Sequence, residues 1–183
     1  YKGDEQLAQI SEKANKIKAE LEAKGISVKF DDRDTHKPGF KFAEYEFKGV
    51  PVRIAMGPRD LENGTVEVAR RDTKEKETLQ QEDIANKIDH LLTKIQDNLY
   101  QKSIDFREEK TYKADSWDEF EKLLNDGGFV YAHWDGTSET EDKIKDLTKA
   151  TIRCIPLNNE QEEGECILTK NPSKQRVVFA KAY

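Results

Sequence analysis

The stretch KPGFKFAEYEFKGVPVRIAM, residues 37–56, decides the fold of the first half of the chain. Pro38 can begin a helix because its ring already holds φ at a helical value, so we expect a short helix from there to Gly49. The apolar side chains that follow recur at every second position, at Val50, Val52, Ile54 and Met56. A period of two residues is typical of a strand with one buried face. A helix followed directly by such a strand indicates an α/β arrangement.

The alternation of helices and strands continues on both sides of this stretch. Before it, apolar residues recur at helical spacing over residues 7–21, and residues 26–30, ISVKF, alternate like a strand. After it, residues 57–64 are typical of a turn, and residues 65–71 and 76–80 of two strands. We therefore expect a mixed β-sheet with flanking helices.

The second half of the sequence predicts elements of its own. Apolar residues keep a helical period from Glu82 to about Lys110, which is long for a globular helix. Ser116 and Ser138 each open an S-x-x-E pattern, in which a serine caps a helix N-terminus. The predicted strands are FVYAHW (129–134), ATIRCIPL (150–157), ECILT (165–169) and RVVFAKAY (176–183). These elements predict a small α+β module.

Composition and charge exclude several classes of protein. The 183 residues carry 31 Lys+Arg against 37 Asp+Glu, a net charge of −6, which excludes a polybasic nucleic-acid arm but not a local basic patch. Residues 1–80 hold 16 basic and 16 acidic residues, net 0, whereas residues 81–183 hold 15 and 21, net −6. An anionic partner should therefore prefer the first half.

Two further patterns bear on the compartment. No apolar run approaches the roughly 20 residues of a membrane helix, and no signal-peptide pattern opens the sequence. Cys154 and Cys166 are too few for a disulfide framework or a four-thiolate metal site. We expect a soluble protein of the reducing cytoplasm and, because the sequence begins with Tyr1, a piece of a longer chain.

Charges of both signs and aromatic residues are densest in residues 31–49, followed by Arg53, Arg59 and Asp60. The pairing edge of guanine offers two adjacent donors, which match a carboxylate, while Arg or Lys matches its O6 and N7 atoms, and unpaired bases stack on aromatic rings. These residue types are therefore compatible with binding single-stranded guanines. The alternative, which composition alone favours, is a solvated charged surface with the aromatic residues as core, namely Phe40, Phe42, Tyr45 and Phe47.

The literal sequence resembles a known family. The segments that carry the resemblance are DDRDTHKPGFKFAEYEFKGVPVRIAMGPRDLENG (31–64), RRDTKEKE (70–77), TKATIRCIP (148–156) and RVVFAKAY (176–183). In this order they resemble the C-terminal part of prolyl-tRNA synthetases that carry an extra domain after the anticodon-binding domain. The resemblance implies an anticodon-binding domain over residues 1–105, with the mixed α/β fold of several class II synthetases. A small C-terminal α+β domain would follow over residues 106–183.

The resemblance also implies which residues read the anticodon. Proline codons are CCN, so the second and third anticodon bases are both guanine. The implied readers are Glu46 and Arg53 for one guanine, Arg59 and Asp60 near the other, Lys76 assisting, and Phe42 as a stacking surface. Arg59 stands where some relatives have lysine, which keeps the charge but changes the donor geometry. The alternative for each is a surface ion pair worth roughly 0 to 1 kcal/mol.

Several partners follow from the same resemblance. It implies binding to proline tRNA, an upstream catalytic domain in the same chain and a homodimer, with no membrane and no DNA partner. ATP and magnesium would belong to the catalytic domain, because no ATP-binding segment occurs here, and we expect this sequence alone to be inactive. FREE at residues 106–109 matches a class II catalytic string, but it falls in a predicted helix, so we interpret it as coincidence. Tyr183 would turn its carboxylate toward the active site, or simply end a strand.

Zinc-binding relatives hold the ion with four cysteines, and this sequence departs from that pattern. The corresponding positions are Trp134, about Glu139, Cys166 and Thr169. With one thiolate of four, we expect no zinc and a structure held by packing instead. We interpret the neighbouring His133 as a structural residue and Cys154 as a buried strand residue.

Three further points stay open in the sequence. The resemblance implies an apolar strand before the first helix, and the sequence begins where that strand should end. A second hypothesis makes the chain a protein-interaction or dimerisation module without RNA binding, which the acidic residues 81–183 and the long helix would favour. A third makes it a free-standing domain that acts in trans.

Overall fold

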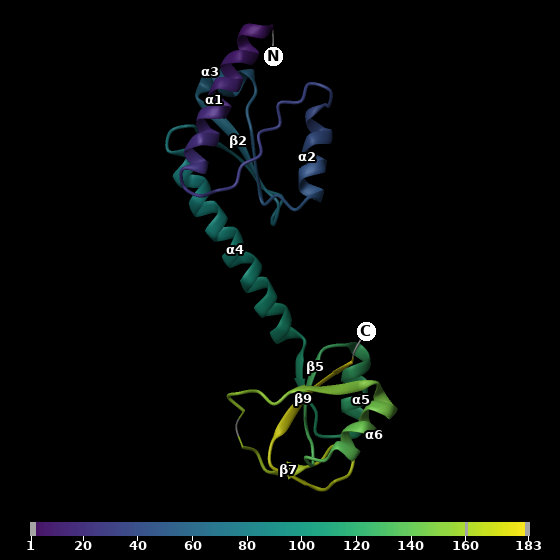
Figure 1. The fold of residues 1–183 in the computed structure, drawn as a ribbon. Coiled ribbons are helices and arrows are strands. Elements are labelled where there is room, and N and C mark those ends of the chain that lie inside the picture. The colour runs from purple at the N-terminus through teal and green to yellow at the C-terminus, as the bar shows by residue number, and fades with distance from the viewer. Residues whose placement is uncertain (1–2, 160, 182–183) are drawn as a thin grey trace. The chain divides into compact units, whose positions relative to one another are not determined.

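The computed structural model describes residues 3–159 and 161–181. They form two compact units that divide between Gln101 and Lys102. Each unit has its own helices and strands (Figure 1). Each also has its own hydrophobic core. Within the described residues, no helix combines the length and the apolar composition that a membrane crossing needs.

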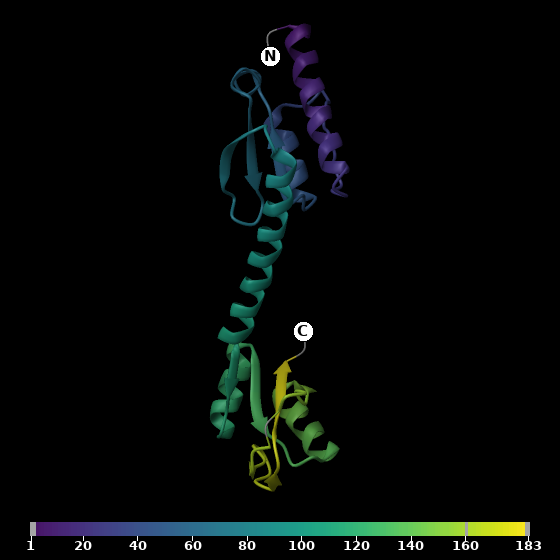
Figure 2. The same cartoon turned by 90° about the vertical axis from the view of Figure 1, so that its left-hand side faces the viewer.

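The first unit combines four helices with a three-stranded sheet. Its elements are α1 (Asp4–Glu22), α2 (Pro38–Phe47), β1 (Val52–Ala55), α3 (Pro58–Asn63), β2 (Thr65–Arg70), β3 (Lys76–Gln80) and most of α4 (Ile84–Glu109). The strands pair antiparallel in the order β1-β2-β3. The long predicted helix is confirmed as α4, one continuous helix of 26 residues that includes the FREE string (Figure 2).

The two faces of this sheet carry different side chains. One face packs against α1 and α4 and builds the core with Val52, Ile54, Val66, Val68 and Leu79. Because successive side chains of a strand point to opposite faces, the intervening Arg53, Glu67 and Lys76 lie on the other face. The predicted strand alternation therefore separates an apolar face from a charged one.

Residues 58–63 form the short helix α3, so the turn predicted over residues 57–64 was wrong. Pro58 occupies the first helical turn, and the Asp60 carboxylate accepts a hydrogen bond of 2.9 Å from the Gly57 backbone N–H. Gly64 ends the helix in the left-handed conformation, with φ of 65°. Proline at the start and glycine at the end are helix signals, but six residues are too few to show a helical period.

The predicted strand over residues 26–30 was also wrong. Ile26 and Val28 do pack against the core, while Ser27 and Lys29 are exposed, so the side chains alternate as expected. The segment nevertheless pairs with no strand in the described part of the chain. Alternation is a property of one segment, whereas a strand also needs a hydrogen-bonded neighbour.

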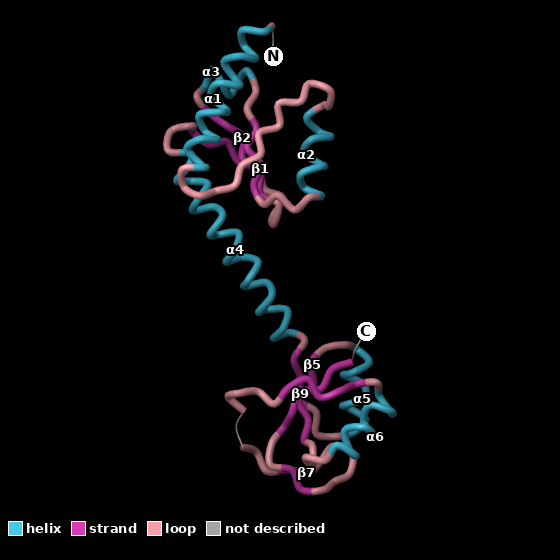
Figure 3. The backbone as a smooth tube through the Cα atoms, viewed as in Figure 1, coloured by secondary structure: helices cyan, strands magenta, loops and turns pink. Residues whose placement is uncertain are grey.

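The second unit is built on a mixed four-stranded sheet (Figure 3). Its elements are β4 (Thr111–Lys113), α5 (Trp117–Asp126), β5 (Phe129–His133), α6 (Ser138–Thr148), β6 (Ala150–Cys154), β7 (Gly164–Glu165), β8 (Pro172–Ser173) and β9 (Arg176–Lys181). The strand order is β4-β5-β9-β6, with β4 and β5 parallel and the other pairs antiparallel. The core centres on Phe120 of α5, whose ring meets Phe179 edge-on at 5.1 Å.

Two predictions for this unit need correction. Most of ECILT is not a strand, because Lys170 N–H donates to the Cys166 carbonyl and closes a tight turn after β7. A helix does start at Ser138 as expected, but the capping residue is Thr137 and not Ser138: the Thr137 hydroxyl accepts from the Thr140 backbone N–H at 3.3 Å. The start expected at Ser116 is confirmed.

The two cysteines lie in different environments. Cys166 is buried, but Cys154 is exposed, so the prediction of a buried Cys154 was wrong. A register shift between Ile152 and Cys154 interrupts the pairing of β6 with β9, and alternation no longer predicts which side chains face the core. Tyr183, for which we expected a position near an active site, lies outside the described residues.

Candidate nucleic-acid interface

Five side chains of alternating charge cross the charged face of the first sheet, and we call them the charge row: Lys74, Glu46, Arg53, Glu67 and Lys76. Arg53 lies at its centre, with Nη2 at 3.3 Å from Glu67 Oε1 and Nη1 at 3.9 Å from Glu46 Oε1. Lys74 Nζ lies 3.4 Å from Glu46 Oε2, and Lys76 Nζ lies 3.9 Å from Glu67 Oε1. The row thus presents carboxylates and cations side by side.

The Arg53 guanidinium is packed as well as paired. Its central carbon lies 3.6 Å from the centre of the Phe42 ring, a cation–π contact that fixes the plane of the group. Only 15% of the Arg53 side chain is exposed, and its buried Nε has no hydrogen-bond partner among the described residues. Arg53 therefore offers a small part of its edge, in a fixed orientation.

Contacts at the C-terminal end of α2 bring Glu46 to this row. Arg71 Nε donates a hydrogen bond of 2.9 Å to the Glu46 carbonyl, one of the last carbonyls of the helix. A cation at this position also interacts favourably with the negative end of the helix dipole. Val50 N–H donates to the Tyr45 carbonyl at 3.0 Å and turns the chain toward β1.

The hairpin that carries Arg71 and Lys74 is held from its other side by Asp72. The Asp72 carboxylate accepts hydrogen bonds from Arg70 at 2.7 Å and from Asn98 of α4 at 2.7 Å. The bond from Arg70 is the main reason that the pKa of Asp72 falls to about 2, although burial opposes it. The hairpin tip is thus fixed relative to the helices of its unit.

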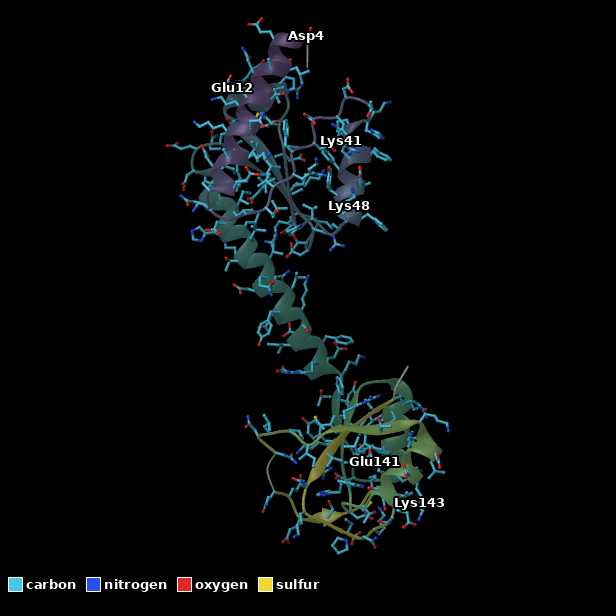
Figure 4. The ribbon with its side chains drawn as sticks, in the orientation of Figure 1. Asp4, Glu12, Lys41, Lys48, Glu141 and Lys143 are labelled. Atoms are coloured by element: carbon cyan, nitrogen blue, oxygen red, sulfur yellow. The ribbon has the colours of Figure 1, made fainter. Side chains whose placement is uncertain are left out.

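A second group of charges joins the loop before α2 to the helix itself. Arg33 donates to Asp31 and to Glu44, both at 2.7 Å, and lowers the pKa of both carboxyls, that of Glu44 to about 2. Lys41 of α2 and Lys48, which caps the C-terminal end of that helix (Figure 4), pair with Asp31 and Glu44 at 3.6 and 2.6 Å. These carboxylates are ionised and engaged within the protein.

Arg59 and Asp60 lie apart from the charge row, on α3. Asp60 uses both carboxylate oxygens within its own unit: Oδ2 accepts from the Gly57 N–H and Oδ1 from the Thr65 hydroxyl at 3.1 Å. Arg59 is exposed. The structure therefore groups four of the six predicted readers, namely Phe42, Glu46, Arg53 and Lys76. No hydrogen bond or ion pair joins that group to α3 in the part of the chain that is described.

The sequence allowed the alternative that the aromatic residues of α2 form core. For Phe40 and Phe47 that alternative was wrong. Phe47 is 93% exposed, and Phe40 is exposed and stacks on His36 with ring centres 4.5 Å apart. Two members of the charge row, Glu67 and Lys74, were not predicted from the sequence. The strand period could have placed Glu67 on the face of Arg53, but Lys74 is positioned by the geometry of the hairpin tip.

In the second unit, the residues at the four zinc positions do not fit a zinc ion. Cys166 supplies a thiol, but the Trp134 indole N–H donates to the Thr137 carbonyl at 3.0 Å, and Thr169 donates its hydroxyl to Asp135 at 2.8 Å. Among the described residues no group of three or more His, Cys, Asp or Glu could hold a metal ion. A structural zinc needs four nitrogen or sulfur ligands, which this set does not provide.

Asp135 instead gathers this region by hydrogen bonds. Its Oδ1 accepts from the Thr137 hydroxyl at 2.8 Å, and its Oδ2 accepts from the Thr140 hydroxyl at 2.8 Å and from the Asn171 amide at 3.2 Å. Together with the bond from Thr169, these contacts join the start of α6 to the turn after β7. Burial raises the pKa of Asp135, but the hydrogen bonds outweigh it and hold the pKa well below its usual value.

His133 has a structural environment, as the sequence predicted. It is buried, and its Nδ1 lies 3.1 Å from the Ser173 hydroxyl. Its Nε2 lies 3.7 Å from Glu162, whose carboxylate also accepts from Arg176 at 3.0 Å. A Cβ atom added to Gly164 would lie only 2.4 Å from Nε2, so glycine is needed there for close packing.

Comparisons with known proteins assign both units. A family model described as "Anticodon binding domain" matches residues 3–91, and one described as "Prolyl-tRNA synthetase, C-terminal" matches residues 117–183. The proteins named proline–tRNA ligase of Porphyromonas gingivalis, Flavobacterium johnsoniae and Bacteroides fragilis are 58%, 56% and 53% identical over the whole of this chain. The chain belongs to the prolyl-tRNA synthetase family.

The resemblance seen in the sequence is thus confirmed, and so is the fold class of an anticodon-binding domain followed by a small C-terminal domain. The chain spans 37% to 38% of the length of these prolyl-tRNA synthetase relatives. The charge row lies entirely within the range that the anticodon-binding model matches.

Proposed function

We propose that the first unit binds the anticodon of proline tRNA and reads its two adjacent guanines. One observation carries this proposal: the Glu46 carboxylate and the Arg53 guanidinium stand side by side on the exposed face of the sheet, 3.9 Å apart. A carboxylate matches the two donors on the pairing edge of guanine, and a guanidinium matches its O6 and N7 acceptors. The family match supplies the partner for this geometry.

The energetics favour an exchange of partners at Glu46. Its side chain is 46% exposed, and its present partner Lys74 is 65% exposed. An ion pair between exposed groups is worth roughly 0 to 1 kcal/mol. A matched contact to a base edge contributes about 1 to 3 kcal/mol of discrimination. A guanine can therefore displace Lys74 from Glu46 with a net gain.

The proposal also gives roles to the four other predicted readers. Arg59, exposed on α3, would contact the second guanine, and Asp60 would position it, because its own carboxylate caps that helix. Lys76 would assist from β3. Phe42 would support a base through the guanidinium that already covers its ring.

We propose the activity of the whole protein from its relatives. As a proline–tRNA ligase it would join proline to its tRNA with ATP, in the cytoplasm and as a homodimer, with ATP and magnesium bound by a separate catalytic domain. Residues 1–105 would bind the anticodon, and residues 106–183 would support the catalytic domain, with Tyr183 positioned near its active site. The supporting observation is the identity of 53% to 58% with proteins of that name.

Binding to two transcripts tests the proposed recognition. We would titrate the 183-residue chain with a proline tRNA transcript and with one in which adenine replaces both guanines. We expect a preference of about fivefold or more for the guanines, from contacts of about 1 to 3 kcal/mol. Glu46→Gln keeps the shape but replaces one acceptor oxygen by a donor, so that preference should be lost.

The matched control is Glu12→Gln, which removes the same charge from an exposed position on α1 (Figure 4). It should keep the preference of the unmodified chain. Equal affinity of the unmodified chain for both transcripts would reject base-specific reading. A stable dimer that binds neither transcript would instead support the alternative, an interaction module suggested by the acidic residues 81–183.

A further inference from the structure

Glu67 joins two cations of the charge row through a single oxygen atom. Its Oε1 lies 3.3 Å from Arg53 Nη2 and 3.9 Å from Lys76 Nζ. The sheet register explains this position, because Arg53 and Lys76 both face Ala69 on the central strand. Glu67 is the next residue of that strand on the same face, so it can reach the cation on either side.

The contact with Glu67 adds an in-plane constraint on Arg53. Phe42 covers one face of the guanidinium at 3.6 Å, which restricts its tilt but not its rotation within the plane. The hydrogen bond from Nη2 to Glu67 fixes that rotation. A guanidinium recognises O6 and N7 of guanine only when its donors point at both atoms, so its rotation decides the match.

Glu67 itself is poorly suited to contact RNA. Its carboxylate already accepts from Arg53 and lies near Lys76, and a negative charge repels phosphate. We propose that Glu67 is a positioning residue, which acts through Arg53 by holding its guanidinium in the orientation that prefers guanine. This inference rests on the proposed anticodon reading, and it adds a specificity-determining residue to that site.

The proposal predicts two effects of opposite sign from one substitution. Glu67→Gln removes a negative charge from the RNA-facing surface, so affinity for RNA in general should stay equal or rise. The same change weakens the hold on Arg53, so the preference for guanine over adenine should fall. A residue that merely stabilised the fold would lower both quantities together.

The experiment measures binding of the 183-residue chain to an RNA stem-loop with the proline anticodon, and to two stem-loops in which adenine replaces one guanine or the other. Glu67→Gln should reduce the preference about threefold to tenfold at the guanine that Arg53 reads and leave the other unchanged. Glu77→Gln is the control, because Glu77 is exposed and pairs with the core-facing Val68, on the opposite face of the same sheet.

Two further variants separate position from charge and from folding. Glu67→Asp keeps the charge but withdraws the carboxylate by one methylene, so it should lose preference as the glutamine variant does. In an Arg53→Ala background, Glu67→Gln should have no further effect on preference, because Glu67 acts only through Arg53. Glu67 is 40% exposed, and circular dichroism would verify that each variant folds.

The outcomes distinguish this inference from the function on which it rests. An unmodified chain without guanine preference would overturn both. An unmodified chain with the preference, but a Glu67→Gln variant that keeps it, would overturn the positioning role alone. Additive effects of Glu67→Gln and Arg53→Ala would do the same, since they would show that Glu67 acts independently.

Discussion

At the scale of single residues, Asp135 shows how one carboxylate can organise a segment. It accepts hydrogen bonds from Thr137, Thr140, Thr169 and Asn171, which belong to separate parts of the second unit. Hydrogen bonds to a charged group are worth more than those between neutral groups. Asp135 therefore cross-links the start of α6 to the turn after β7.

We expect Asp135→Asn to lower the free energy of unfolding by about 1 to 3 kcal/mol, because the amide turns a donor toward other donors. Since the pKa of Asp135 is lowered by folding, its stabilisation is present above the unfolded pKa of about 4 and is lost as the pH falls below it. Urea denaturation at pH 7 and pH 3 should show that the unfolding free energies of the unmodified chain and the Asp135→Asn variant differ less at pH 3.

The control for this measurement is Asp142→Asn, at an exposed position of α6. It should change the unfolding free energy little at either pH. A loss for Asp135→Asn that stays the same size at pH 3 would show that the ionised carboxylate is not the source of the stability.

Residue types could be predicted from the sequence better than their partners. The strand period places Arg53 and Glu67 on one face, and that placement is correct. Nothing local predicts that Lys74 would reach Glu46, which is 28 positions earlier, or that Asp60 would cap its own helix. Such pairings depend on the hairpin and on the docking of α2, which are long-range features.

At the scale of elements, the start of α5 depends on its N-cap. The Ser116 hydroxyl accepts from the Glu119 backbone N–H at 3.3 Å, while the Glu119 carboxylate accepts from the Asp115 N–H. We expect Ser116→Ala to lower the free energy of unfolding by about 1 kcal/mol, since it leaves a helix donor unpaired. Thermal or urea denaturation would measure the change.

Ser103→Ala is the matched control, because Ser103 is an exposed residue within α4. Alanine has the higher helix propensity, so this variant should be as stable as the unmodified chain or slightly more so. Equal losses for the two variants would contradict a specific capping role for Ser116.

The elements that the sequence predicted well are those that span several repeats of their side-chain period. The spacing of apolar residues over α4 and the alternation in β2 were sufficient to locate both. The helix α3 was missed because it is short. Residues 26–30 were mistaken for a strand because their own sequence cannot show that no described strand pairs with them. Periodicity reports which side chains face the core, and only indirectly which hydrogen bonds form.

At the scale of the whole molecule, each unit has a core of its own. We expect Phe120→Ala to destabilise the second unit by about 3 to 5 kcal/mol, because Phe120 is fully buried and packs on Phe179. Hydrogen exchange with mass spectrometry should show faster exchange in β5 and β9, while β2 keeps its protection.

The reciprocal variant is Val68→Ala, which opens the core of the first unit. It should expose β2 and β3 to exchange and leave β9 protected. Equal loss of protection in both units from either substitution would show that the cores do not unfold separately.

The presence of two units followed from the sequence, but the order of strands in the second sheet did not. The last strand, β9, lies between β5 and β6. Its Val178 lies opposite Tyr131 of β5, which is 47 positions earlier. Its Ala180 lies opposite Thr151 of β6, which is 29 positions earlier. Local periodicity carries no information on such pairing, which depends on the packing of both helices around the sheet.

The backbone at Lys74 has a consequence for how this surface would change under selection. Its φ of 64° is a left-handed conformation, which costs about 1 kcal/mol or more for any residue but glycine. Selection for heat resistance alone would favour glycine there and would remove the ammonium group that neighbours Glu46. Glycine at position 74 would relax the backbone of the hairpin, whereas lysine places a cation beside Glu46. This chain has lysine there, at the cost of the strained backbone.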